Sequence, residues 1–156
     1  MPNHFIIRVN DGINFINSRN PCWGVKSGKN NSIRGYVNNN IKKSDILSFL
    51  TSKKYGGKFI GMAEYINYYD RNNLKDNENT YTNNDMNWTG GEDWSIQINY
   101  KNLYMIDHVN IFACIQGSQT ILNFATFFEK KKITENLEEH YKNIVRYYSP
   151  CWVLYK

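Results

Sequence analysis

The chain has 156 residues, of which 41% are hydrophobic and 15% aromatic, and its formal net charge is +5. This length fits one domain spanning residues 1–156, and this composition excludes a wholly disordered chain. No stretch approaches the roughly 18 apolar residues of a membrane-spanning helix. The first five residues also lack the basic-then-apolar layout of a signal peptide. We therefore expect a soluble, monomeric, intracellular protein, cytoplasmic or nuclear, with no membrane partner.

The basic excess favours polyanionic partners, because Lys and Arg release counterions from phosphates. The excess is modest, so it does not identify a partner by itself. The three cysteines, Cys22, Cys114 and Cys151, form no C-x-x-C pair and are too few for a disulfide framework, so we expect reduced thiols and no zinc site. Abundant Asn, Lys, Ile and Tyr suggests an AT-rich coding genome, which is compatible with a viral or parasite source.

The first elements follow from short apolar runs and turn residues. Residues 5–9 form a β-branched and aromatic run that Asn10-Asp11-Gly12 ends, which predicts a strand and a tight turn. Apolar residues at helical spacing predict a short helix over 13–19. Residues 20–25 should be extended, because the proline in this segment disfavours a helical residue before it. The polar, glycine-containing segment 26–31 is predicted to be a loop.

A hairpin is predicted in the middle of the chain. An apolar run at 45–51 indicates a buried strand, and 53–58 supplies a loop whose glycines allow positive φ. The return strand covers 59–65. The next segment, 72–85, is rich in Asn, Asp and Thr, which predicts a flexible loop.

The remaining predictions complete an α+β fold. Trp88 and Trp94 frame a Gly-Gly turn, and the alternation over 95–100 is typical of a half-buried strand. Residues 109–115 and 120–124 indicate another pair of strands, and 134–148 has the clearest amphipathic helical pattern. Many short strands with few helices predict a curled or closed, barrel-like mixed sheet flanked by helices.

The tryptophans are the most informative residues. Trp152, among apolar neighbours, is most simply a core residue. Trp23 lies in Pro-Cys-Trp-Gly, and Trp88 and Trp94 bracket Thr-Gly-Gly-Glu-Asp. Indole rings beside loops can form a cage for a flat base, at about 1–3 kcal/mol per stacked base. Ordinary packing is the alternative interpretation of a tryptophan near a turn.

The order of these segments, over almost the whole chain, resembles the YTH domain, a reader of N6-methyladenosine in RNA. Residues 5–10 look like the opening strand of that family. Residues 45–65, with F-x-G-x-A-x, look like its central hairpin, and 87–94 look like its aromatic loop. The same segments are similar to the EVE domain, a relative in the PUA-like superfamily that recognises modified bases, often in DNA. The pair Trp88 and Trp94 favours the YTH resemblance.

The resemblance implies a cage for one methylated base. Trp23 and Trp88 would form opposite walls, and Trp94 would close the floor near the methyl group. The other implied base contacts are Asn10 to the adenine ring edge, the carbonyl of Gly24 or Trp23 to the remaining N6–H, and Ser52 to another ring nitrogen. Methyl burial adds about 0.8 kcal/mol, so a modest preference over adenosine is expected. The ligand would be single-stranded RNA, because the base must be flipped out.

Phosphate contacts are expected from cations around the mouth of the cage: Arg8, Lys26, Lys29, Arg34, Lys53, Lys54 and Lys58. The chain departs from the family pattern around Gln116-Gly117-Ser118, which carries no basic residue for a phosphate. Gly24 also stands where many family members carry a small polar residue, which leaves that contact to the main chain. The three histidines are far apart in the sequence, so we expect no metal site, and we expect no cofactor.

Two other classes of function stay open. An enzyme would need Cys22 as nucleophile with His4, His108 or His140 as base, but no spacing joins them. Glu92 and Asp93 are adjacent carboxylates that alternate sides in an extended chain, which makes a poor acid/base pair. In the third interpretation, a protein-interaction module, the aromatic residues would be an anchor patch. A reader of modified DNA remains the alternative within the resemblance.

Overall fold

The computed structural model describes residues 3–109 and 121–123. The predicted helix over 134–148, most of the predicted strand over 109–115, and Trp152 lie outside these residues. The described elements, in chain order, are the strands and helices β1 (His4–Arg8), α1 (Ile13–Asn17), β2 (Cys22–Val25), α2 (Ser32–Asn40), β3 (Ile46–Leu50), β4 (Phe59–Asp70), α3 (Asn83–Met86), β5 (Ile96–Val109) and β6 (Ile121–Asn123). Single 3-10 turns lie at Lys29–Asn31 and Lys53–Tyr55.

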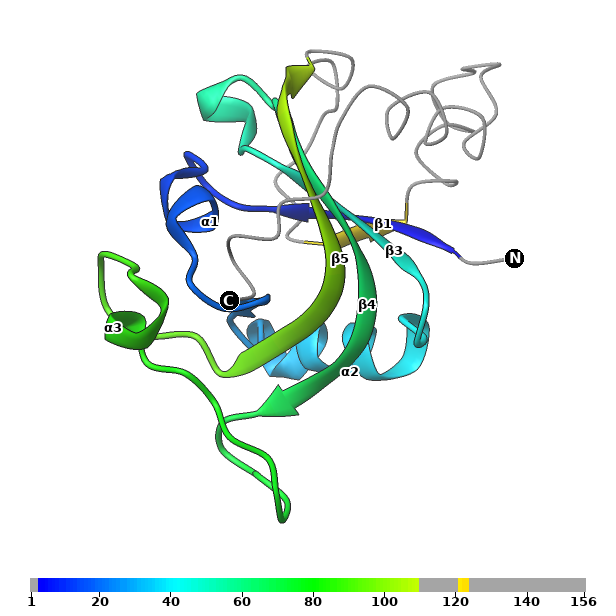
Figure 1. Ribbon diagram of the computed structural model, residues 1–156. Helices are drawn as coiled ribbons and strands as arrows, with labels where there is room; N and C mark the ends of the chain where they lie inside the picture. The colour runs from blue at the N-terminus through cyan, green and yellow to red at the C-terminus, as the bar shows by residue number, and fades with distance from the viewer. Residues whose placement is uncertain (1–2, 110–120, 124–156) are drawn as a thin grey trace.

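One mixed sheet organises the described chain, in the order β2-β5-β4-β3-β1-β6. Strands β1 and β3 are parallel, and the other neighbouring strands are antiparallel. The long strands β4 and β5 bend strongly, so that the sheet curls (Figure 1). These features confirm the prediction of an α+β fold with a curled mixed sheet. Among the described residues, β2 and β6 are the two edges of the sheet.

The core lies on the inner face of the sheet, where α1 and α2 pack. Phe15 of α1 stacks on Phe49 of β3 with ring centroids 4.5 Å apart, and Phe49 in turn contacts Tyr100 of β5. Val37 of α2 is fully buried in the same cluster. Burying side chains of this size contributes about 1.5–3 kcal/mol each. This packing holds β2 and α1 in fixed positions on either side of the turn that joins them.

Strand β2 lies at an edge because it pairs only with β5 among the described strands. Its register places Trp23 opposite Ile98 and Gly24 opposite Gln97. Val25 is buried in the main core, whereas Cys22 belongs to a second apolar cluster with Met86, Trp88 and Trp94. The alternation of side chains along a strand explains this division, because successive residues face opposite sides of the sheet.

The hairpin is confirmed: β3 and β4 pair antiparallel around the loop at 51–58. The strands predicted at 5–9 and 120–124 and the helix predicted over 13–19 are also found, with slightly different ends. The half-buried strand predicted at 95–100 is longer than expected and continues to Val109. Its extension is paired with β4 along most of its length.

Two helices were not anticipated. The pattern over α2 gave no prediction, because its asparagines have low helix propensity and Val37 is its one fully buried side chain. The prediction of a loop over 72–85 is wrong at its end, where α3 begins. Thr82 accepts a hydrogen bond from the backbone N–H of Asp85, whose carboxylate accepts from the N–H of Thr82. This capping box satisfies donors at the helix start, which stabilises a turn that composition alone suggests is irregular.

Candidate functional site

Trp23, Trp88 and Trp94 line one pocket with a volume of about 310 Å³. The ring centroids of Trp23 and Trp88 are 5.1 Å apart, and those of Trp88 and Trp94 are 5.8 Å apart. The volume lies at the lower end of the range for small-molecule sites, about 300–1,000 Å³. The structure therefore brings together three rings that are separated by up to 71 positions in the sequence. We call this site the tryptophan pocket; Gly24, Lys26, Asn14, Asn83 and Asp93 also line it.

The tryptophan pocket opens at the edge of the sheet beside β2. The N–H of Tyr100 donates to the carbonyl of Pro21, and the β2–β5 register continues from this bond. In an antiparallel ladder, backbone groups alternate between facing the partner strand and facing away. Trp23 therefore faces β5 with its backbone, and the N–H and C=O of Gly24 face the side of β2 on which no described strand pairs. Of the two carbonyls expected to meet a base, that of Gly24 is the one directed away from the sheet.

Gly24 makes room for Trp94. A Cβ atom on Gly24 would lie 2.5 Å from Cδ2 and 2.6 Å from Cγ of the Trp94 ring. Carbon atoms in contact are normally about 3.5–4.0 Å apart, so no larger residue fits without displacing the indole. The glycine is thus required by a close approach, and its substitution changes the position of a pocket wall.

The buried indole N–H groups are both satisfied by the protein. Trp88 Nε1 donates to Ser18 Oγ at 2.8 Å, and Trp94 Nε1 donates to Asn83 Oδ1 at 2.9 Å. Ser18 Oγ itself donates to the carbonyl of Asn14, one turn earlier in the chain. Both rings are 9% exposed or less. Their orientation is therefore set before any ligand arrives, and neither N–H needs a ligand as acceptor.

The loop between Trp88 and Trp94 is held by two asparagines. The carboxamide of Asn14 donates to the carbonyl of Thr89 and accepts from its N–H and its hydroxyl, at 3.0–3.3 Å. Asn83 Nδ2 donates to the carbonyl of Gly90 at 3.1 Å. These bonds connect α1 and α3 to opposite parts of the same loop. An exposed loop containing two glycines is thereby fixed in one conformation.

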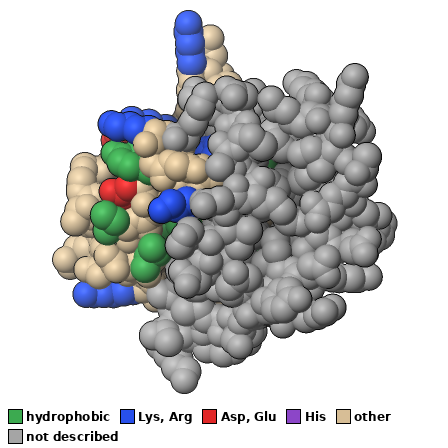
Figure 2. All heavy atoms as spheres, turned by 90° about the horizontal axis from the view of Figure 1, so that it is seen from above, with side chains coloured by type: hydrophobic (Ala, Val, Ile, Leu, Met, Phe, Trp, Pro, Cys, Tyr) green, Lys and Arg blue, Asp and Glu red, His purple; other side chains and the backbone are tan. Residues whose placement is uncertain are grey.

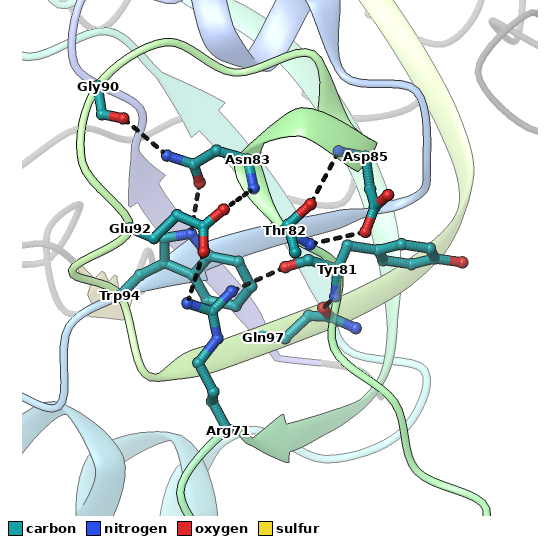
Figure 3. Close-up of polar contacts among 9 residues, drawn as sticks. All are labelled: Arg71, Tyr81, Thr82, Asn83, Asp85, Gly90, Glu92, Trp94 and Gln97. Carbon is teal, nitrogen blue, oxygen red and sulfur yellow. Dashed lines mark hydrogen bonds and ion pairs between the residues drawn. The ribbon is translucent and has the colours of Figure 1, made fainter.

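Arg71 completes this network from the end of β4 (Figure 3). Its guanidinium carbon lies 3.7 Å from the centroid of the Trp94 ring, within the range of a cation–π contact. One nitrogen donates to the carbonyl of Tyr81 at 2.8 Å, and the other lies 3.6 Å from Glu92 Oε2. The second oxygen of Glu92 accepts from the N–H of Asn83 at 2.6 Å. Arg71 thus connects the sheet, α3 and the loop around one indole ring.

The rings meet edge to face. The planes of Trp23 and Trp88 are inclined by 64°, and those of Trp88 and Trp94 by 75°. A base between two parallel walls needs about 7–8 Å between them, which is twice a carbon–carbon contact. In this arrangement Trp23 and Trp88 are adjacent walls rather than opposite walls. Trp23 is half-buried and is the ring of this pair that borders solvent more.

Asn10 and Ser52 lie next to one another, but they do not line the tryptophan pocket. The N–H of Ser52 donates to the carbonyl of Asn10 at 2.7 Å, which joins the end of β1 to the hairpin loop. Asn10 is exposed and has a left-handed φ of 55°. The two residues expected to contact the adenine ring therefore lie together where the turn after β1 meets the hairpin loop, and neither lines the pocket.

Lys26 is the predicted phosphate contact that borders the pocket. Its ammonium lies 2.8 Å from Asp93 Oδ2, and both side chains are exposed. The hydrogen bond from Lys26 lowers the pKa of Asp93. This ion pair spans the pocket mouth from the end of β2 to the loop before β5. Because it is solvated, it opens readily when a phosphate competes for the ammonium.

The other predicted cations are dispersed. Arg34 pairs with Asp70 at 3.0 Å, and Arg8 donates to the carbonyl of Thr51 while burial lowers its pKa. Lys29, Lys54 and Lys58 are exposed, and nothing is described of the Lys53 side chain. On the described part of the face in Figure 2, Lys and Arg side chains lie separately among hydrophobic, neutral and acidic groups. The described cations thus include an ion-paired arginine and separate lysines rather than one continuous stripe.

Cys22 lacks the surroundings of a reactive thiol. Its side chain is buried, its Sγ lies 3.6 Å from the Sδ of Met86, and burial raises its pKa to about 12. Nucleophilic cysteines have a lowered pKa, because the thiolate is the reacting form. Among residues 3–109 and 121–123, no three His, Cys, Asp or Glu side chains gather in a group fit for a metal ion. Within the same residues, no helix is both long and apolar enough to cross a lipid bilayer.

Four residues that shape the pocket were not anticipated: Asn14, Ser18, Arg71 and Asn83. The T-N-N-D sequence at 82–85 is a capping-box pattern and would have indicated α3, which carries Asn83. Nothing in the local sequence of Arg71 or Asn14 distinguishes either from a solvated surface residue. Their role depends on contacts with residues 21 and 75 positions away.

Comparison with protein-family models finds no match to this chain, and comparison with curated proteins finds none either.

Proposed function

We propose that the chain binds single-stranded RNA that contains N6-methyladenosine. The methylated adenine base is flipped out of the strand and enters the tryptophan pocket. The observation that carries the proposal is the convergence of Trp23, Trp88 and Trp94 on one pocket beside β2, which is an edge strand among the described strands. The resemblance to the YTH domain, within the PUA-like superfamily, supplies the identity of the base. The curled mixed sheet is compatible with such a fold.

The chemistry of the walls supports a flat, largely apolar ligand. Indole faces attract a base and its methyl group by dispersion. The hydrogen bonds from Nε1 of Trp88 and Trp94 to other side chains hold both rings in place before a ligand binds. The backbone of Gly24 points away from β5 beside these rings, on the side of β2 where no described strand pairs, and carries one donor and one acceptor. An N6–H of methylated adenine is a suitable donor for that carbonyl. The methyl group would then lie against indole rather than water.

The edge-to-face rings define what binding requires. Because Trp23 and Trp88 are in contact, a base can stack on the outward face of Trp23, or it can separate the pair. The second route moves Trp23, which is the half-buried member, while Trp88 remains held by Ser18. Phosphate contacts would come from Lys26 at the mouth and, along the strand, from the separate lysines. A moderate dependence of affinity on salt is expected.

The test is titration with four matched single-stranded oligonucleotides, RNA and DNA, each containing adenine or N6-methyladenine. Methylated RNA should bind most tightly, and Trp23→Phe should weaken binding less than Trp23→Ala. Tyr55→Ala is the matched control, because it removes an exposed aromatic ring from the hairpin loop outside the pocket. Thermal melting of each variant separates lost binding from lost folding.

Equal affinity for all four oligonucleotides would overturn the proposal. A preference for DNA, or for a modified cytosine, would favour the EVE-like alternative. Unchanged binding by a folded Trp23→Ala variant would place any nucleic-acid site elsewhere on the chain.

A further inference from the structure

A second hollow, with a volume of about 360 Å³, lies on the sheet face opposite the core. We call it the amide groove. Asn67 and Tyr69 of β4 contribute to it, together with Gln97 and Asn99 of β5, which are their partners across the strand pair. The segment that leads into α3 forms the other side through Asn77, Asn79 and Tyr81. None of the described residues that line the groove carries a charged side chain.

The carboxamides on the sheet form a directional hydrogen-bonded chain. The N–H of Tyr81 donates to Gln97 Oε1 at 2.9 Å, and Gln97 Nε2 donates to Asn99 Oδ1 at 2.9 Å. Asn99 Nδ2 then donates to Asn67 Oδ1 at 2.8 Å. Gln97, the first carboxamide of this hydrogen-bonded series, is only 1% exposed, whereas Asn67, the last, is exposed. The series therefore runs from a buried side chain to the surface.

This arrangement presents oriented donors and acceptors to a ligand. Each carboxamide has two N–H donors and an oxygen with two lone pairs, and the chain uses one donor and one lone pair of Asn99. The rings of Tyr69 and Tyr81 border the same groove. Oriented carboxamides beside aromatic rings, without charge, suit a neutral planar ligand with its own donors and acceptors. A nucleobase has these properties, since Asn and Gln pair with the adjacent donor and acceptor of adenine.

The amide groove and the tryptophan pocket are neighbours. Tyr81 borders the groove and Asn83 borders the pocket, two positions later in the chain. Likewise Pro21 borders the groove and Trp23 the pocket. Two residues of an extended chain span at most about 7 Å, which is comparable to two steps of about 3.4 Å between stacked bases. One nucleic-acid strand can therefore reach both hollows.

We infer that the amide groove holds an unmodified nucleobase, adenine fitting its donors and acceptors best, from the strand whose methylated base occupies the tryptophan pocket. This inference rests on the proposed function. The phosphates between the two bases pass over the segment that borders both hollows. The groove would then give the protein a preference for the sequence that flanks the methylated base.

The experiment compares wild type with the double variant Asn67→Ala/Asn99→Ala. Asn73→Ala is the control, because it removes an exposed asparagine that lines neither hollow. The probes are free N6-methyladenosine, a single-stranded RNA with one central N6-methyladenosine between adenines, and the same RNA with abasic flanks. Wild type should lose about tenfold in affinity when the flanking bases are removed. The double variant should bind the intact RNA about tenfold more weakly than wild type, and it should be insensitive to abasic flanks.

Both proteins should bind the free nucleoside equally, which separates this inference from the proposed function. If wild type binds the nucleoside and the double variant still loses affinity on abasic RNA as wild type does, the groove assignment is overturned and the pocket assignment stands. If wild type does not bind methylated nucleoside or RNA, the proposed function fails and the groove assignment fails with it. Melting curves must show that the double variant is folded. If it is not, the single variant Asn67→Ala, which changes one exposed side chain, is compared with wild type on the same probes.

Discussion

The contact between Gly24 and Trp94 gives the sharpest prediction. In Gly24→Ala, the new Cβ would lie 2.5, 2.6 and 2.9 Å from three atoms of a rigid indole. Relief to a normal contact needs a movement of about 1 Å. The ring cannot move freely, because its Nε1 is bound to Asn83 and Arg71 lies over it. The substitution therefore either strains the edge of β2 or breaks the indole hydrogen bond.

The expected cost combines overpacking, about 1–3 kcal/mol, with weakening of one buried hydrogen bond, about 1–3 kcal/mol. Allowing for partial relaxation, we expect Gly24→Ala to lower the free energy of unfolding by about 2–4 kcal/mol. For a chain of this length, that lowers Tm by about 5–15 °C. Urea unfolding and thermal melting, followed by tryptophan fluorescence, measure both quantities. Binding of methylated RNA should also weaken, because a wall of the tryptophan pocket moves.

Two glycines provide matched controls, since an added Cβ meets nothing within 4 Å at either Gly35 or Gly91. Gly35→Ala lies inside α2 and should be neutral or stabilising by about 0.5–1 kcal/mol. Gly91→Ala lies in the same loop as Trp94 and should leave stability unchanged; because Gly91 lines the pocket, Gly35→Ala is the control for binding. If Gly24→Ala melts at the same temperature as Gly91→Ala and binds as well as Gly35→Ala, Trp94 does not lie against Gly24 and the account of the pocket wall is refuted.

Four further predictions concern the surroundings of the pocket. Burial raises the Cys22 pKa from 9.0 to about 12, so its alkylation, followed on its own peptide by mass spectrometry, should be slow in the folded protein at pH 8 and rapid in urea. The same shift should lower stability as pH rises from about 9 toward 12, because the unfolded chain loses the thiol proton first; a fall no smaller in Cys22→Ala would contradict this. Arg71→Lys should lower the free energy of unfolding by about 0.5–1.5 kcal/mol and alter the near-ultraviolet circular dichroism of Trp94. An ammonium cannot contact Tyr81 and Glu92 together while stacking on the Trp94 ring. Identical spectra would argue against Arg71 holding that ring. Thr82→Ala should cost about 1 kcal/mol through loss of the α3 cap, with rescue by Thr82→Ser and little effect from Thr80→Ala.

Local patterns in the sequence predicted much of the sheet. The runs at 5–9, 45–51 and 59–65 are β-branched or apolar and end at turn residues, and they form β1, β3 and the first part of β4. Their boundaries follow from nearest-neighbour chemistry, since glycine and asparagine supply the left-handed turns at Asn10 and Gly56. The α2 helix was missed because its local sequence gives no such signal. Its asparagine-rich end has no strong helix preference, and the tertiary packing of Val37 stabilises it.

The candidate site was only partly predictable. The position of Trp23, Trp88 and Trp94 beside turns left ordinary packing open, and the resemblance to the YTH domain implied that they share a site; the structure brings them to one pocket. The expected partners Asn10 and Ser52 do not line it, because the turn after β1 joins Asn10 to Ser52 of the hairpin loop instead.

Sequence alone determined which residues are apolar, which turns need glycine or asparagine, and that three of the indoles lie beside turn residues. Tertiary structure decided which of these meet. The pairing of β2 with β5 brings Gly24 under Trp94, and the contact of Asn14 with Thr89 spans 75 positions. Arg71 becomes a support for an indole only because β4 ends beside the start of β5. Such contacts depend on the register between distant segments, which the free energy of the whole core selects and no local pattern encodes.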